Sequence, residues 1–85
     1  MKLVSVIIIT KNQSRFLKKC INSIVVQSYK NIEVIIVDDN SSDNTKEIIE
    51  SNKSNKIRYF LNEKKLGLAG LRNFGVLQSR GDYIF

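Results

Sequence analysis

The chain has 85 residues, of which 42% are apolar, and its 14 lysine and arginine residues against 8 acidic residues give a net charge of +6. This length allows one small domain with a thin core. A single cysteine, Cys20, excludes an internal disulfide, and the absence of histidine excludes histidine-based acid–base catalysis and almost all zinc sites.

The basic residues are spread along the whole chain, with no arginine-rich helix and no aromatic residues interleaved among them. Nucleic-acid binding favours clustered cations, so the sequence predicts a solvated basic surface and no nucleic-acid partner. A general affinity for anionic lipid headgroups or polyphosphates is the alternative. The apolar run at residues 4–9 is too short to cross a bilayer, no cleavage pattern follows it, and we expect a cytoplasmic protein.

Residues 3–10 are almost entirely β-branched or apolar, which predicts a strand buried on both faces, as in parallel sheets. Residues 14–28 predict an amphipathic helix, because apolar side chains recur there at helical spacing. Cys20 lies within its apolar stripe, so we expect it to pack in the core. The stripe consists of Phe16, Leu17, Cys20, Ile21, Ile24 and Val25.

Residues 32–37 predict a second buried strand, which runs into a segment rich in helix N-cap residues. A short helix at residues 45–50 and a third strand at residues 57–61 follow. A polar loop at residues 62–67 then leads to a third predicted helix at residues 68–79. The apolar positions expected on its inner side are Leu68, Leu71, Gly75 and Val76.

A fourth strand is expected to begin at Tyr83, and the order β-α-β-α-β-α-β predicts an α/β fold with a parallel sheet and helices on both faces. Residues 1–85 then form one segment. Its apolar end, residues 83–85, would leave an unfinished sheet edge, a feature that favours self-association. We expect this segment to be the truncated front part of a larger domain.

Ligands of parallel sheets bind beyond the carboxyl ends of the strands, which here are residues 10–12 and residues 38–40. The adjacent carboxylates of Asp38 and Asp39 could accept hydrogen bonds from a base or ribose, could bind a hard cation, or could simply lead into a capped helix. Arg72, in the third helix, could clamp a diphosphate or lie in solvent. No Walker A or Gly-x-Gly-x-x-Gly motif is present, and the EF-hand pattern fails.

Four blocks that cover nearly the whole chain resemble, in order, the amino-terminal half of family 2 glycosyltransferases. They are VSVIIITKN at residues 4–12, IIVDDNSSD at 35–43, the segment from Asn62 through Gly67 to LRNFG at 71–75, and GDYIF at 81–85. The resemblance implies a nucleotide-diphospho-sugar-binding domain of the Rossmann-like GT-A fold.

The resemblance also implies roles for individual residues. Asp39, with Asp38 beside it, would accept the N3–H of a uracil-type base, Arg72 would meet the base or the diphosphate, and Gly67 would keep its loop close to the ligand. The residues expected to lie against the nucleoside are Ile9, Thr10, Lys11 and Asn12.

The implied reaction is the inverting transfer of a sugar from a nucleotide sugar, expected to be UDP-linked, to the hydroxyl of a glycan or lipid-linked acceptor in polysaccharide or glycoconjugate synthesis. It implies a divalent metal, Mg²⁺ or Mn²⁺, and peripheral association with the inner face of the membrane. The metal motif and the catalytic base are expected after Phe85, so the 85 residues are expected to bind the nucleotide without catalysis.

The sequence departs from the family pattern at three positions. Ile9 stands where proline is usual, Lys11 where tyrosine is common, and Leu71 where alanine usually precedes the arginine. With lysine in place of this tyrosine, we expect Lys11 to contact phosphate instead of stacking on the base.

A noncatalytic nucleotide-binding module or a phospho-switch module of the receiver type is the alternative. Receivers carry an acidic pair after the first strand, whereas the pair here follows the second strand. A small basic RNA-binding domain is a third hypothesis, and it predicts a steep dependence of affinity on salt.

Overall fold

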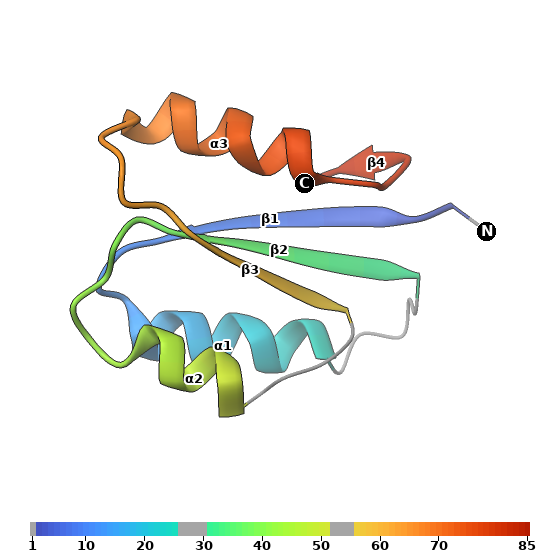
Figure 1. Cartoon of the computed structure of the whole chain (residues 1–85). Helices are drawn as coiled ribbons and strands as arrows, with labels where there is room; N and C mark the ends of the chain where they lie inside the picture. Colours follow the sequence, from blue (N-terminus) through green and yellow to red (C-terminus); the bar gives the residue numbers. More distant parts are fainter. Residues whose placement is uncertain (1, 26–30, 52–55) are drawn as a thin grey trace.

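The computed structural model describes residues 2–25, 31–51 and 56–85 (Figure 1). Strands and helices alternate along these residues, which confirms the predicted α/β class. In chain order they are β1 (Val4–Thr10), α1 (Ser14–Val25), β2 (Ile32–Asp38), α2 (Thr45–Ser51), β3 (Ile57–Leu61), α3 (Gly67–Gln78) and β4 (Tyr83–Ile84). The predicted end of the first helix, beyond Val25, lies outside the described residues.

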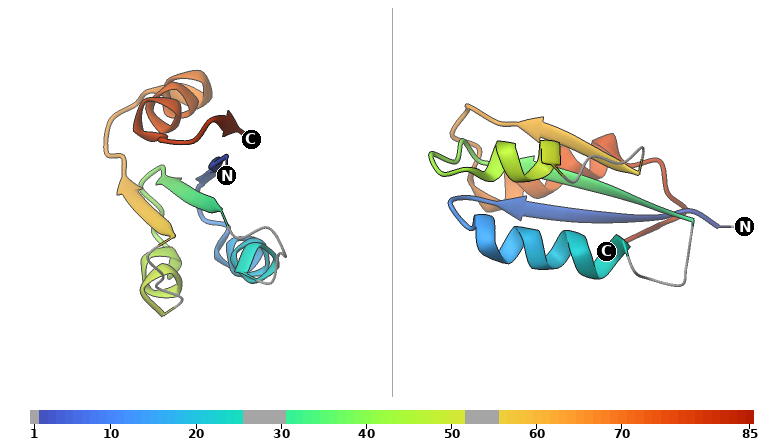
Figure 2. Two further views of the ribbon diagram at one scale, coloured as in Figure 1. Left: turned by 90° about the vertical axis from the view of Figure 1, so that its right-hand side faces the viewer. Right: turned by 90° about the horizontal axis from the view of Figure 1, so that it is seen from below.

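The four strands form one parallel sheet in the order β3-β2-β1-β4. Strands β2 and β3 are added on one side of β1, and β4 is then added on the other side of β1, so the strand order reverses there. Helices α1 and α2 cover one face and α3 covers the other (Figures 1 and 2). Thr10 pairs with Asp38, and Asp38 pairs with Leu61, so β1, β2 and β3 end side by side. The carboxyl ends of these strands therefore share one edge of the molecule.

The core has two layers, because successive residues of β2 point to opposite faces. Val34 and Ile36 pack with Leu17, Ile21 and Ile49 beneath α1 and α2. Ile35 and Val37 pack with Leu71 beneath α3. The prediction that this strand is buried on both faces is confirmed, whereas most of β1 is only half-buried.

The predicted apolar stripes of two helices were too wide. Phe16 is 64% exposed, and in α3 Leu68 and Val76 are 71% and 40% exposed. The sheet reaches only a narrow arc of each helix, which is occupied by Leu17 and Ile21 in α1 and by Leu71 and Gly75 in α3. Cys20 is half-buried at the edge of this arc. The side chain of Val25 lies outside the description.

A polar network crosses the sheet at the amino-terminal half of the strands. The Glu33 carboxylate accepts hydrogen bonds from the Ser5 hydroxyl at 2.5 Å and from the Arg80 backbone N–H at 2.5 Å. Arg58 Nη1 lies 3.3 Å from Glu33 Oε1 and donates to the carbonyl oxygen of Gln78 at 2.6 Å. The network joins β1, β2 and β3 to the end of α3.

The last residues of the chain extend the sheet beside β1. The N–H of Phe85 donates to Ser5 O, and the N–H of Ile7 donates to Phe85 O, both at 2.8 Å. Tyr83, Ile84 and Phe85 are 55%, 43% and 73% exposed. Self-association through this edge stays a prediction.

Candidate functional site

The loops that follow β1 and β2 are tied together by the side chain of Asn12. Its Oδ1 accepts hydrogen bonds from the backbone N–H groups of Ser42 at 2.8 Å and Asp43 at 3.3 Å. The backbone N–H of Asn12 donates to Ser41 Oγ at 2.9 Å. Asn12 and Asn40 adopt φ values of 53° and 55°, a conformation that asparagine tolerates better than most residues. The two loops are therefore joined by hydrogen bonds into one unit.

Asp43 extends this unit to the first turns of two helices. Its carboxylate accepts hydrogen bonds from the Thr45 hydroxyl, from the Thr45 N–H at 3.1 Å and from the Ser14 N–H at 3.1 Å. These bonds, led by that of the Thr45 hydroxyl, hold the pKa of Asp43 below its ordinary value of 3.8. One carboxylate thus satisfies N–H groups at the starts of α1 and α2.

Asp38 and Asp39 have different surroundings although they are adjacent. Asp38 is 2% exposed, and its two oxygens accept hydrogen bonds from the Ser41 N–H at 2.9 Å and the Tyr59 hydroxyl at 2.6 Å. Burial, with the hydrogen bond and the charge of Asp38, raises the pKa of Tyr59. The buried Asp38 therefore links β2 to β3 through Tyr59, whereas the side chain of Asp39 is only half-buried.

A cavity of about 300 Å³ opens where the carboxyl ends of β1 and β2 meet the start of α3. It brings together five of the predicted site residues from three separate segments of the chain. Gln13, Leu68 and Leu71 complete the lining, and sequence reasoning had not placed them in the site. The five predicted residues are Ile9, Thr10, Lys11, Asp39 and Gly67.

The start of α3 borders this cavity through Gly67 and Leu68. Gly67 has φ of +72°, and no side chain caps the first turn of the helix at Leu66. Because the first N–H groups of a helix have no intrahelical partners and carry partial positive charge, they favour an anion. The exposed Arg72 lies one helical turn after Leu68, which lines the cavity.

Three predicted site residues do not line the cavity, namely Asn12, Asp38 and Arg72. Asn12 and Asp38 instead hold the loops around it. Asn62, which follows β3, donates from Nδ2 to Asp39 Oδ1 at 3.2 Å. The only signal for Asn62 in the sequence was its place in the third resembling block.

The hydroxyl of Thr10 is buried and has no hydrogen-bond partner among the described residues. Valine has nearly the same shape without the hydroxyl, so Thr10→Val removes an unsatisfied group. We expect the variant to be as stable as the parent or more stable by up to about 1 kcal/mol. Urea unfolding measures the stability of both proteins. A variant less stable than the parent by more than about 1 kcal/mol would show that the hydroxyl has a stabilising partner.

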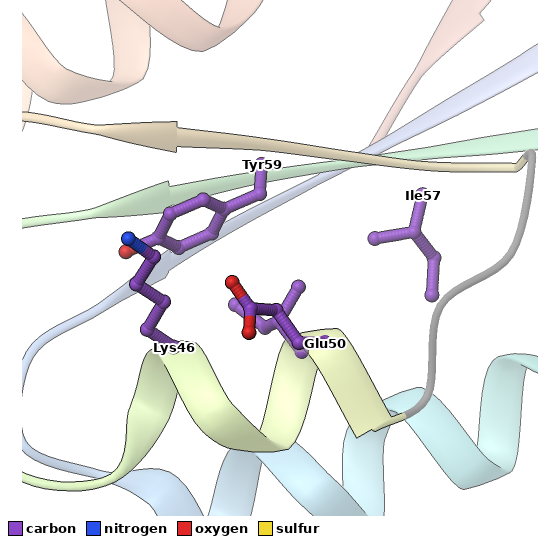
Figure 3. Close-up of a pocket in the computed structure, with 5 residues that line it drawn as sticks. Lys46, Glu50, Ile57 and Tyr59 are labelled. Atoms are coloured by element: carbon purple, nitrogen blue, oxygen red, sulfur yellow. The ribbon is translucent and has the colours of Figure 1, made fainter.

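A second cavity, of about 220 Å³, lies on the opposite face of the sheet between α2 and β3 (Figure 3). Ile49, Ile57 and Tyr59 make its walls largely apolar, and Lys46 and Glu50 extend from α2 beside it. The Tyr59 hydroxyl is the group that donates to Asp38 Oδ2 at 2.6 Å. It shares no lining residue with the first cavity.

Within residues 2–25, 31–51 and 56–85, no three acidic, cysteine or histidine side chains are grouped so that they could hold a metal ion. In the same described part, no helix has the length and apolar character needed to cross a membrane.

The comparison with protein families matches residues 5–85 to the family described as glycosyl transferase family 2. The chain belongs to glycosyltransferase family 2. The match includes every residue predicted for the nucleotide site, and the family assignment made from the four sequence blocks is confirmed.

Relatives of this family 2 chain are named glycosyltransferases. The chain is 38% identical over 85 residues to glycosyltransferase GlyG of Streptococcus pneumoniae. It is 41% identical over 83 residues to a Campylobacter jejuni enzyme named GalNAc(5)-diNAcBac-PP-undecaprenol beta-1,3-glucosyltransferase. These alignments cover 98% and 94% of the chain but only 28% and 27% of the relatives. The chain therefore spans about a quarter of their length.

Solved structures confirm the GT-A type of fold. The mannosyltransferase PcManGT of Pyrobaculum calidifontis, solved in complex with GDP-Man and Mn²⁺, matches with a TM-score of 0.88 at 21% identity, over 98% of this chain and 26% of that one. S. aureus TarS 1-349 matches with a TM-score of 0.85 at 31% identity, over 96% of this chain and 26% of that one.

Proposed function

We propose that this chain carries the donor-nucleotide site of an inverting glycosyltransferase that uses a UDP-linked sugar. The observation that carries the proposal is the cavity at the carboxyl ends of β1 and β2, which joins Lys11, Asp39 and Gly67 in a family 2 chain. Its lining carries charges of both signs. Asp39 contributes a carboxylate, and Lys11 and the start of α3 contribute positive charge.

This distribution of charge suits a nucleoside diphosphate. The Asp39 carboxylate accepts the N3–H of uracil, as a charge-assisted hydrogen bond. The ammonium of Lys11, the N–H groups at Gly67 and Leu68, and the guanidinium of Arg72 attract the diphosphate. Ile9 and Thr10 form the floor beneath the nucleoside, while Asn12 and Asp38 keep the surrounding loops in place.

In the whole enzyme, an acceptor hydroxyl attacks the anomeric carbon and gives its proton to a general base, the bond between that carbon and the diphosphate oxygen breaks, and the configuration inverts. Positive groups at the cavity stabilise the departing diphosphate. A divalent cation, Mg²⁺ or Mn²⁺, would supply further neutralisation of its charge when bound. The complex of PcManGT with GDP-Man and Mn²⁺ supports both a nucleotide sugar and a divalent metal for this fold. We propose no catalytic base among the 85 residues.

Lipid-linked glycans are the proposed acceptors. The Campylobacter relative is named for an undecaprenol-linked substrate, and an Escherichia coli relative, WfaP, 40% identical over 84 residues, is named for a diphosphoundecaprenol-linked one. We propose a cytoplasmic enzyme that associates peripherally with the inner face of the membrane, where such acceptors are reached.

Asp39→Ala tests the proposal. Because the carboxylate is the group that accepts the base N–H, we expect the variant to bind UDP at least about tenfold more weakly, with no loss of affinity for CDP, whose N3 carries a lone pair in place of the hydrogen. Isothermal titration of both nucleotides with Mg²⁺ measures the two dissociation constants. Glu47→Ala, at an exposed position of α2, is the matched control and should leave both affinities unchanged.

The thermal transition of Asp39→Ala should stay close to that of the parent chain. If the variant loses its fold instead, Asp39 has a structural role, and the base-recognition role is rejected. Equal losses for UDP and CDP would also reject it, because they would show a general rather than a base-specific contribution.

A further inference from the structure

We propose that Asn62 is a positioning residue that fixes the Asp39 carboxylate for selection of the nucleobase. This inference rests on the proposed function, since it concerns the same site. Asn62 does not line the cavity, and it acts on the nucleotide through Asp39.

The backbone places Asn62 directly beside the acidic pair. Its N–H donates to the carbonyl oxygen of Asp38 at 2.8 Å, which continues the pairing of β3 with β2 by one residue beyond Leu61. The side chain then lies next to Asp39, and Nδ2 donates to Asp39 Oδ1 at 3.2 Å. A strand-end register therefore sets the distance between the two side chains.

The orientation of the Asn62 amide is determined by its partners. Nδ2 also donates to the carbonyl oxygen of Lys64 at 2.6 Å, and Oδ1 accepts from the Lys64 N–H at 3.4 Å. Both groups facing Nδ2 are acceptors without a hydrogen of their own, so a flipped amide would set oxygen against oxygen at two contacts. One hydrogen of Nδ2 therefore bonds to the carbonyl oxygen of Lys64, and the other bonds to Asp39 Oδ1.

This arrangement gives the two oxygens of the Asp39 carboxylate different surroundings. Oδ1 is held by Asn62, whereas Oδ2 has no hydrogen-bond partner in the part of the chain that the structure describes. Asp39 lines the cavity and is only half-buried, so Oδ2 is the oxygen available to a ligand. Fixing one oxygen restricts rotation of the carboxylate and thereby reduces the cost of orienting it when a ligand binds.

A fixed acceptor oxygen selects bases by their ring nitrogen. Uracil presents a ring N–H at this kind of acceptor, whereas the corresponding N3 of cytosine carries a lone pair that repels it. A carboxylate free to rotate would turn away from cytosine and lose part of this discrimination. We therefore expect Asn62 to contribute to the preference for UDP over CDP.

A double-mutant cycle tests the inference in the 85-residue chain. Dissociation constants of UDP and CDP are measured for the parent, Asn62→Ala, Asp39→Ala and the double variant. We expect Asn62→Ala to lower the preference for UDP over CDP by about tenfold, and to change nothing further in the Asp39→Ala background, because coupled residues are not additive. Asn73→Ala, an exposed asparagine of α3, is the control and should keep the parental preference.

The outcomes separate the two proposals. A parent chain without preference for UDP would reject base recognition at Asp39, and the role of Asn62 with it. A parent with that preference, together with an Asn62→Ala variant that keeps it, would reject the role of Asn62 alone. Additive effects in the cycle would do the same, since they would show that Asn62 acts only on the loop.

A measurement on the parent chain covers the case in which Asn62→Ala fails to fold. The side-chain amide protons of Asn62 are observed by NMR during titration with UDP and with CDP. We expect them to shift with UDP and to stay in place with CDP. Shifts of equal size with both nucleotides, or with neither, would overturn the inference.

Discussion

Replacing Arg58 with methionine is expected to lower the free energy of unfolding by about 2–4 kcal/mol. Arg58 contacts the Glu33 carboxylate at 3.3 Å and donates to Gln78 O at 2.6 Å, and its guanidinium lies over the Phe60 ring, 5.4 Å from the centroid. Its removal leaves Glu33, whose side chain is 10% exposed, without its ionic partner. For 85 residues the whole stability is about 4–13 kcal/mol, so the loss is a large fraction.

Arg80→Met is the matched control, because Arg80 takes part in the same network only through its backbone N–H. Its exposed side chain contributes little, and we expect a change within about 0.5 kcal/mol. Urea unfolding of both variants at pH 7 measures the difference. Equal stabilities for the two variants would mean that Arg58 is not needed to compensate the charge of Glu33.

Glu33 is expected to make the fold sensitive to acid. Burial alone would raise its pKa, but hydrogen bonds from Ser5, from the Arg80 N–H and from Arg58, together with the charge of Arg58, lower it below the ordinary value of 4.5. The unfolded chain therefore binds a proton at Glu33 more readily than the native chain does. The stabilisation is fully present above about pH 4.5 and is lost as the pH falls through the lowered native pKa.

Glu33→Gln removes the ionisable group and keeps the shape of the side chain. We expect the variant to be less stable than the parent at pH 7, because it loses charge-assisted hydrogen bonds. The gap should narrow as the pH falls below about 4.5. Urea midpoints of both proteins between pH 7 and pH 3 measure this difference in stability. A difference that stays constant over this range would show that the stabilisation by the Glu33 carboxylate is not lost in acid.

Much of the fold could be predicted, because the spacing of apolar residues and the lengths of the apolar segments in the sequence match the strands and helices of the structure. The apolar run in β2, broken only by Glu33, correctly indicated burial on both faces, and the alternation of elements correctly indicated a parallel sheet. The width of the buried helix faces could not be predicted. Phe16 and Leu68 fit a helical repeat, but the sheet leaves them in solvent, and only tertiary packing decides this.

The candidate site was predictable in its location rather than in its details. The rule that ligands bind at the carboxyl ends of parallel strands, with the family resemblance, placed Thr10, Lys11 and Asp39 together. Two adjacent aspartates look alike in sequence, yet Asp38 is turned to Tyr59 and Asp39 to the cavity, since consecutive strand residues face opposite sides. The contact of Asn62 with Asp39 depends on the register of β3, which no local pattern specifies.

The polar network at the other end of the strands was not predicted either. A glutamate within the run of β2 and a serine in β1 gave a weak signal, because charged residues are rarely buried without partners. The partners come from Arg58 and from the backbone at Arg80, 25 and 47 residues away along the chain. Such distant pairing becomes visible only when the sheet order is known.

The central claim is that the cavity between β1, β2 and the start of α3 binds the nucleotide of the donor. Amide shift mapping of the ¹⁵N-labelled 85-residue chain, titrated with UDP and Mg²⁺, tests it most directly. We predict weak binding with shifts concentrated near Thr10, Asp39, Gly67 and Arg72, and none at the second cavity around Ile49 and Ile57. A folded sample that shows no shifts at millimolar UDP, or shifts only around the second cavity, would contradict the account.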